Sequence, residues 1–138
     1  MKQRATVLVL ILLAAAMLSG CGASRRNFPP PDLTGHWIQV NPADNFYQVA
    51  EISDDWIEVY WHLTADDTEY LYWAGSFTPP QTGEEPYSWI SENDMEKTMT
   101  DVHARREDSL TFTYKNGRLS FIQIQGRLHL TVAMEKAD

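Results

Sequence analysis

An Asn-Gly pair in the second half of the chain constrains the fold more than any other feature. Asn116 and Gly117 separate two short runs in which apolar and polar residues alternate. A two-residue type I′ turn needs positive φ at both positions, which Asn and Gly tolerate best. A turn centred on this pair joins two antiparallel strands and places Phe112 opposite Phe121. The chain is therefore expected to contain a tight hairpin.

A second tight turn is expected at Gln125-Gly126, where another alternating run begins. This turn pairs Phe121 with Leu130. Phe112, Phe121 and Leu130 then lie side by side on one face of a sheet, and the two turns agree on that face. Their agreement predicts a three-stranded meander with one apolar side.

Most of the remaining sequence has the same character, with nine runs rich in Val, Ile, Thr and aromatic residues that predict strands. These runs are 36–41, 46–53, 56–63, 69–77, 87–91, 99–104, 109–115, 119–124 and 127–135. Only the stretch 93–106 is suited to a helical turn or two. Ile122 and Ile124 break the alternation, so a bulge or an apolar cover is expected there. Short antiparallel strands must hide their edges, so we expect an all-β fold, a small barrel in preference to a two-layer sandwich.

The first 21 residues have the pattern of a bacterial lipoprotein signal peptide. Lys2 and Arg4 precede an apolar run from residue 5 to residue 17, which is shorter than the roughly 20 residues of a membrane-spanning helix. The next four residues, Leu18-Ser19-Gly20-Cys21, resemble a lipobox, in which small residues admit the signal peptidase and the cysteine sulfur is acylated. The resemblance implies that Cys21 becomes the mature N-terminus and carries acyl chains that anchor the protein durably in a membrane.

This interpretation divides the chain into a cleaved signal peptide at 1–20, a lipidated tether at 21–31 and a β-barrel domain at 32–138. Small residues, two arginines and a proline run suit the tether to a spacer near anionic headgroups. Cys21 is the only cysteine, so the domain cannot hold an internal disulfide and depends on packing. We expect the protein on the extracytoplasmic face of the cell membrane, or at the outer membrane if the host is Gram-negative.

Acidic residues are concentrated in the first half of the domain. Between Asp32 and Glu96 there are 14 Asp and Glu and no Lys or Arg, whereas Lys97 to Asp138 contains seven basic and five acidic residues. Such a surface repels nucleic acid and attracts a basic protein or a cation. A solvated acidic surface without a partner is the simpler alternative. Nucleic acid is not expected as a partner under either interpretation.

The stretch 55–77 is rich in aromatic residues and predicts a hairpin with its turn between Asp66 and Asp67. This register pairs large side chains across the strands, Trp61 with Tyr72 among them, and such pairs stabilise hairpins. One face has the composition of a core wall: Ile57, Val59, Trp61, Leu63, Tyr70, Tyr72 and Ala74. The opposite face is too apolar for plain exposure to water and supplies the candidate binding residues: Trp56, Glu58, Tyr60, His62, Trp73 and Phe77.

The sequence leaves open what covers this second face. A folded-over segment such as residues 79–89 would make it part of the core, whereas an uncovered face would bind a ligand or a partner. Tryptophan and tyrosine rings beside Glu58 and His62 suit a sugar, whose C–H faces stack on rings, and suit a protein partner equally.

Sequence signatures of catalysis are mostly absent. The chain has no nucleophile elbow, zinc-protease motif or phosphate-binding glycine loop, and its four histidines are scattered. Acidic groups around Asp66 and around Asp94 lack the spacing of a calcium loop and are expected to be solvated turns. Glu58 with His62 is the one arrangement that suggests an enzyme. We predict no catalytic residues, no metal and no cofactor.

Two further resemblances concern the domain itself. The runs YLYWAGSFTPP and YSWISENDMEKT are similar to small uncharacterised lipoproteins of actinobacteria and their prophages, and Gly35-x-Trp37 resembles the Gly-x-Trp motif of lipocalin-like (calycin) barrels. The first implies an envelope lipoprotein and, in a prophage, a role in surface exclusion of other phages. The second implies that Trp37 closes one end of a barrel.

The sequence thus predicts a membrane-anchored, non-catalytic binding module at the bacterial envelope, with an unknown envelope protein or glycan as its partner. One alternative is an inhibitor of a basic cell-wall hydrolase, similar to lysozyme-inhibitor lipoproteins, although those commonly carry a disulfide that this chain cannot form. Others are a calycin-like barrel that binds a small ligand or glycan, and a purely structural lipoprotein.

Overall fold

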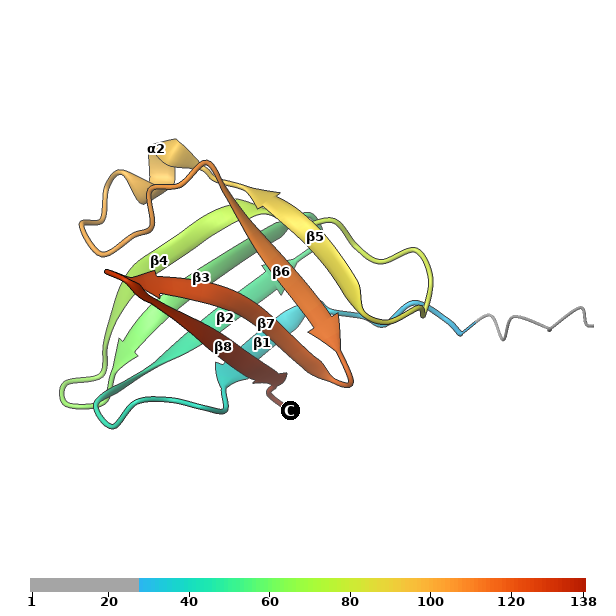
Figure 1. Cartoon of the computed structure of the whole chain (residues 1–138), viewed down its shortest axis with the longest axis horizontal. Coiled ribbons are helices and arrows are strands. Elements are labelled where there is room, and N and C mark those ends of the chain that lie inside the picture. Colours follow the sequence, from blue (N-terminus) through green and yellow to red (C-terminus); the bar gives the residue numbers. More distant parts are fainter. Residues whose placement is uncertain (1–27) are drawn as a thin grey trace, which may run out of the picture.

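The computed structural model describes residues 28–138, which form eight strands and one short helix (Figure 1). Their bounds are β1 Gly35–Gln39, β2 Phe46–Ser53, β3 Trp56–Leu63, β4 Thr68–Ser76, β5 Tyr87–Glu92, α2 Met95–Thr98, β6 Ser109–Lys115, β7 Arg118–Gln125 and β8 Leu128–Lys136. The predicted signal peptide, Cys21 and most of the predicted tether lie outside the described residues.

All eight strands belong to one antiparallel sheet, in the order β4-β3-β2-β1-β8-β7-β6-β5. Except for β4 and β5, each strand pairs with its neighbour in sequence, and β1 pairs with β8, so the sheet curls into a nearly closed up-and-down barrel (Figure 1). The predicted all-β barrel is confirmed. Three predicted strands, 46–53, 56–63 and 109–115, have the predicted bounds.

The two ends of the barrel differ, and they lie at opposite sides of Figure 1. At one end, which we call the closed end, the chain enters at Phe28, and the β4–β5 loop and the β6–β7 hairpin lie beside it. The β2–β3 turn at 54–55 also lies at the closed end. The other end, which we call the open end, carries the four remaining connections: residues 40–45, 64–67, 93–108 and 126–127.

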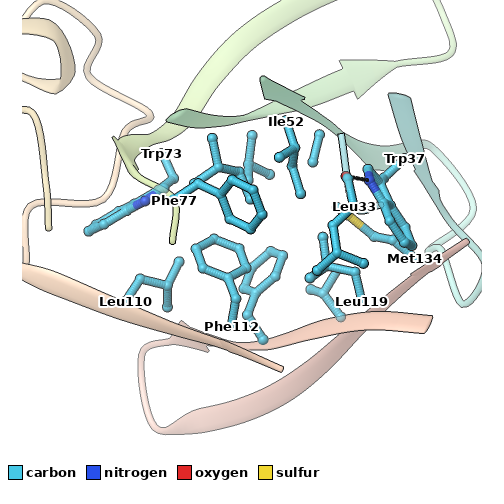
Figure 2. Close-up of a cluster of buried hydrophobic side chains, with 14 of the residues drawn as sticks. Leu33, Trp37, Ile52, Trp73, Phe77, Leu110, Phe112, Leu119 and Met134 are labelled. Atoms are coloured by element: carbon cyan, nitrogen blue, oxygen red, sulfur yellow. Dashed lines mark hydrogen bonds between the residues drawn. The ribbon is translucent and has the colours of Figure 1, made fainter. Parts of the chain in front are cut away.

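Aromatic and aliphatic side chains fill the barrel (Figure 2). Phe112 lies between Trp89 and Phe121, with both pairs of ring centroids 5.2 Å apart. Near the closed end Trp37 is fully buried, and its indole N–H donates to the carbonyl of Leu33 at 2.9 Å (Figure 2). Because the domain has no cysteine, burial of these large rings is the main source of its stability.

The seam between the edge strands β4 and β5 is closed by the connection from β5 to β6, with little direct pairing. The N–H of Arg105 donates to the carbonyl of Tyr72 at 2.8 Å. The carboxylate of Asp101 accepts the N–H of Leu71 at 3.0 Å. These bonds satisfy backbone groups of β4 that would otherwise form an exposed edge.

The predicted strand at 99–104 is wrong, because this segment makes local backbone bonds. Asp94 caps α2 by accepting the N–H of Lys97 at 3.1 Å. Turns follow the helix, and the N–H of Ala104 donates to the carbonyl of Asp101 at 3.3 Å. Backbone groups that bond to residues three positions away in sequence are not free to pair with a neighbouring strand. The helical turn expected within 93–106 is confirmed as α2.

The predicted β6–β7 hairpin is confirmed in detail. Phe112 pairs with Phe121, and Asn116 and Gly117 both have positive φ, 52° and 78°. The tolerance of Asn and Gly for positive backbone φ therefore determined this turn, as the sequence indicated.

The predicted register of the β7–β8 turn at Gln125-Gly126 is wrong by two residues. Gly126, with φ of 61°, is the first residue of the turn, so Phe121 pairs with Val132 instead of Leu130. Glycine adopts this φ at lower cost than glutamine, which explains the shift. Val132 consequently occupies the core position predicted for Leu130, and Leu130 is 43% exposed at the open end.

Ile122 and Ile124 lie on the outer face of β7 without the predicted bulge. Strands β7 and β8 pair through both positions with no shift of register. The two side chains are 43% and 44% exposed, so the alternative of an apolar cover is not realised within residues 28–138 either.

The β3–β4 hairpin joins the predicted strands in a different register. Its turn spans residues 64–67, and a β-bulge interrupts the ladder midway. Trp61 therefore pairs with Tyr70, whereas the predicted register paired it with Tyr72. On the other side of the bulge the shift is a single residue, since Trp73 pairs with Val59 and the predicted register paired it with Tyr60. A shift of one residue reverses the side to which a side chain points, so Trp73 enters the barrel.

Candidate functional site

The predicted binding face is only partly present. Trp73 and Phe77 are 0% and 4% exposed and belong to the core, where Figure 2 shows Phe77 facing Phe112 and Trp73 on the side of Leu110. The indole N–H of Trp73 donates to the Ser91 hydroxyl at 2.9 Å, and Phe77 packs edge to face on Trp89. The assignment of Trp73 and Phe77 to a binding face is wrong because it depended on the incorrect hairpin register.

Three other candidates form a cluster on the outer face of β3. The carboxylate of Glu58 accepts the indole N–H of Trp56 at 3.0 Å and the hydroxyl of Tyr60. Lys97, which lies in α2, forms an ion pair with the same carboxylate. Glu58 is therefore fully engaged by groups of its own chain.

These contacts determine the protonation of the cluster. Partial burial opposes ionisation of Glu58, but its hydrogen bonds, first the one from Lys97, outweigh burial and hold the pKa of the carboxyl below its usual range. Burial, followed by the bond to Glu58, raises the pKa of Tyr60 above its usual range. A glycosidase acid needs a carboxyl with a raised pKa, so Glu58 is not suited to donate a proton.

His62 belongs to a different cluster, nearer the open end. Its ring nitrogens lie 3.0 Å from the carboxylate of Asp67 and 3.3 Å from that of Glu69. The ring also packs against Tyr47, with centroids 4.5 Å apart. Glu58 and His62 share no partner within residues 28–138, and their proposed cooperation in an enzyme has no support in this geometry.

The cover that the sequence left open is supplied by α2. Lys97 reaches across to Glu58 on the outer face of β3, and Asp94 at the start of α2 bonds the carbonyl of Ala74 in β4. The predicted cover at 79–89 lies instead at the closed end and in the core. The outer face of β3 is thus partly covered by the protein itself.

A hollow at the open end is the feature that the sequence prediction missed. A recess of about 200 Å³ is lined by ten residues of the loops and of the inner faces of the strands, and none of the ten is charged. Phe46, Trp61 and Leu130 supply its apolar surface, and Gln123 is among its polar residues. A more apolar shelf of about 440 Å³ adjoins it and shares Phe46 and Trp61 with it.

Glutamines on the inner faces of the strands distinguish this end of the barrel. Gln39 is engaged by the fold, since its carbonyl accepts the N–H of Gln48 at 2.9 Å and its amide donates to the carbonyl of Asn41 at 3.1 Å. Gln48 is fully buried, and neither polar atom of its side chain has a partner within residues 28–138. An unpaired buried amide costs about 1–3 kcal/mol.

Gln123 is the buried amide that reaches the hollow. Its side chain is 4% exposed and lines the recess, and its amide is not one of the fully enclosed, unpaired groups of the described chain. Gln125, two residues further along β7, lines both the recess and the shelf and is exposed. Strand β7 therefore presents amides to the hollow, whereas Gln39 is already paired.

The connection 101–107 narrows one side of the open end. The guanidinium of Arg105 donates to the carbonyl of Ile122 in β7 at 2.8 Å. The ring of His103 lies against Tyr70 of β4, with centroids 4.3 Å apart. The connection is thus attached to both β4 and β7, and it leaves the recess beside β1, β2 and β8 accessible.

The sequence contains a signal for this hollow, which is the presence of glutamines at inward-facing positions of the alternating strands. The confirmed strand β2 places Gln48 between Phe46 and Ala50 on its inner face, and β7 places Gln123 after Phe121 in the same way. Polar residues at core positions of adjoining strands indicate either a buried network or a site.

No metal site is evident in residues 28–138, where no three His, Cys, Asp or Glu are grouped to hold an ion. Several of the acidic turn residues instead have partners in the fold, since Asp67 and Glu69 lie beside His62 and Asp94 caps α2. None of the helices in this part of the chain has the length and apolarity needed to cross a membrane.

Comparison with known proteins gives no assignment. No protein-family model matches the chain, and no match is found among curated proteins or among solved structures. The function has to be argued from the residues of this chain.

Proposed function

We propose that this protein is a lipid-anchored, non-catalytic binding module of the bacterial envelope whose ligand site lies at the open end of the barrel. The observation that carries the proposal is the uncharged recess at that end, lined by Trp61 and by the buried amide of Gln123. Small-molecule sites are typically concave and mostly apolar, with a few polar groups that fix the ligand's orientation.

The lipobox ending at Cys21 supports attachment to a membrane. The described chain begins at the closed end, where the carbonyl of Phe28 accepts the N–H of Gly83 at 2.9 Å. Six residues lie between Cys21 and Phe28, and the seven Cα-to-Cα steps that join the two span at most about 25 Å when fully extended. An acylated Cys21 would therefore keep the closed end near the bilayer and direct the open end away from it, toward envelope ligands.

The outer face of β3 is less suited to be the main site. Glu58 already accepts hydrogen bonds from Trp56, Tyr60 and Lys97, so a ligand would have to displace groups of the protein itself. The alternative function, inhibition of a basic hydrolase, is supported only by the acidic composition and by no particular contact in the structure. Surface exclusion of phages is one use to which an envelope-binding module could be put.

The test compares two tryptophans in the full-length protein held in detergent. Envelope extract is passed over wild type, Trp61→Ala and Trp56→Ala, and retained material is analysed. Wild type and Trp56→Ala are expected to retain the same component, and Trp61→Ala is expected to lose it while keeping its circular dichroism spectrum. Loss with Trp56→Ala and retention with Trp61→Ala would place the site on the outer face and contradict the proposal.

A further inference from the structure

We propose that the recess at the open end binds one residue of a neutral carbohydrate, packed on Trp61 and hydrogen-bonded by Gln123 and Gln125. The inference rests on the proposed binding function and adds the chemical class of the ligand. Its support comes from the charge, polarity, aromatic geometry and size of the recess.

The absence of charge in the recess disfavours an ionic ligand. No residue that lines it is charged. The neighbouring hollow contains a charged pair, Arg105 and Glu107, whose Nε and Oε2 atoms lie 2.9 Å apart as an ion pair. A carboxylate, phosphate or ammonium group entering the recess would lose its water without gaining a counter-charge.

The polar groups of the recess disfavour a purely apolar ligand, because such a ligand could not form hydrogen bonds with them. Gln123 is 4% exposed and lines the recess, and its amide is not one of the fully enclosed, unpaired groups of residues 28–138. A hydrocarbon in the recess would remove the remaining water from this amide and leave it unpaired. Hydroxyl groups of a sugar are both donors and acceptors, so they can pair with the carbonyl and with the NH₂ group of a glutamine.

Aromatic packing fixes the ring that the sugar would contact. Trp61 lies edge to face with Phe46, with centroids 5.0 Å apart, and with Tyr72, with centroids 5.4 Å apart. Two such contacts hold the indole in one orientation beside the amides of β7. A sugar ring presents an apolar C–H face and a rim of hydroxyls, which is the combination that a fixed indole next to two amides can satisfy.

Size limits the ligand in the recess to a single ring. The recess, about 200 Å³, is smaller than the roughly 300–1,000 Å³ of sites for drug-sized molecules. The adjoining shelf of about 440 Å³ leaves space for a neighbouring ring of the same chain. A short glycan is thus a better match than an isolated monosaccharide.

The experiment titrates full-length protein in detergent micelles with three trisaccharides, followed by tryptophan fluorescence and calorimetry. N,N′,N″-Triacetylchitotriose and maltotriose are neutral and distinguish an N-acetylated glycan from one with hydroxyls only, and trigalacturonate is the charged control. At least one neutral trisaccharide is expected to bind, and trigalacturonate is not. Gln123→Leu and Trp61→Ala are each expected to weaken binding about tenfold or more, the loss equivalent to one good polar or stacking contact.

Gln123→Leu is the decisive variant because it removes the amide and keeps an apolar side chain of similar size in the buried position. Ile90→Ala, an exposed change on β5 away from the open end, is the matched control and should bind as wild type does. The inference is overturned if neither neutral trisaccharide binds, or if binding is the same in Gln123→Leu. If envelope material is still retained and its retention still depends on Trp61, the proposed function stands without the carbohydrate. If no neutral trisaccharide binds and retention does not depend on Trp61, both proposals are contradicted.

Discussion

Gln48 is the single residue whose environment departs most from ordinary packing, since its amide is fully buried and unpaired within the described chain. Gln48→Leu removes the unpaired group and retains most of the volume. We expect the free energy of unfolding to rise by about 1 kcal/mol. Urea denaturation of both proteins measures the difference. A clear fall in stability would show that the amide has a partner in solution, such as a buried water.

Trp73 and Trp56, which the sequence placed on one face, should behave differently on truncation. Trp73→Ala removes a fully buried ring and its bond to Ser91, so a loss of about 3–5 kcal/mol is expected. Trp56→Ala removes a partly exposed ring and one bond to Glu58, with a loss of about 1 kcal/mol. Thermal and urea unfolding compare the two. Equal losses would contradict the observed register of β3 and β4.

The lowered pKa of Glu58 predicts a definite dependence of stability on pH. A carboxyl whose pKa is lower in the folded than in the unfolded state stabilises the fold above its unfolded pKa, and this contribution disappears as the pH falls through the folded value. Glu58→Gln should therefore be less stable than wild type at pH 7, and the difference should shrink in acid. Urea titrations at neutral and acidic pH test this. A difference that grows in acid would exclude the ion pair with Lys97 as its cause.

At the scale of elements, Gly75 is critical to the seam between β4 and β5. A side chain there would overlap the carbonyl oxygen of Glu92 and the hydroxyl of Ser91. Gly75→Ala is expected to force the edge strands apart and to lower the free energy of unfolding by roughly 1–3 kcal/mol. Hydrogen exchange of the amides that bridge the seam should accelerate, above all that of Asp94, which donates to the carbonyl of Ala74. Unchanged exchange would mean that the seam is looser than the contacts indicate.

The sequence predicted most strands correctly, but it predicted the register of only some hairpins. The physical reason differs from one hairpin to the next. Asn116-Gly117 determined its turn because both residues accept positive φ. The β3–β4 turn has no such pair, and a bulge that the alternation does not reveal shifts the strands, so Trp73 changes face. The sequence predicted a helical turn within 93–106 but not its position. The position of α2 depends on its cap Asp94 and on its contact with β4, which are set by the tertiary structure.

At the scale of the whole molecule, the barrel was predictable and most of the candidate site was not. Alternating strands must close their edges, which led to a barrel from composition and pattern alone. Glu58, Trp56 and Tyr60 do meet on one face, as predicted, but they are paired with one another and with Lys97. The open-end recess is lined by the connection 40–45 and by strands far apart in sequence, and no local pattern identifies their common end.

The most direct test of an open-end site is photo-crosslinking in living cells, with a photoreactive phenylalanine at one exposed position at a time. Leu128 marks the open end, Ile90 the outer face of β5, and Lys115 the closed end. Specific adducts with envelope material are expected from Leu128 and from neither of the other two. Adducts from Ile90 or Lys115, with none from Leu128, would contradict a binding site at the open end.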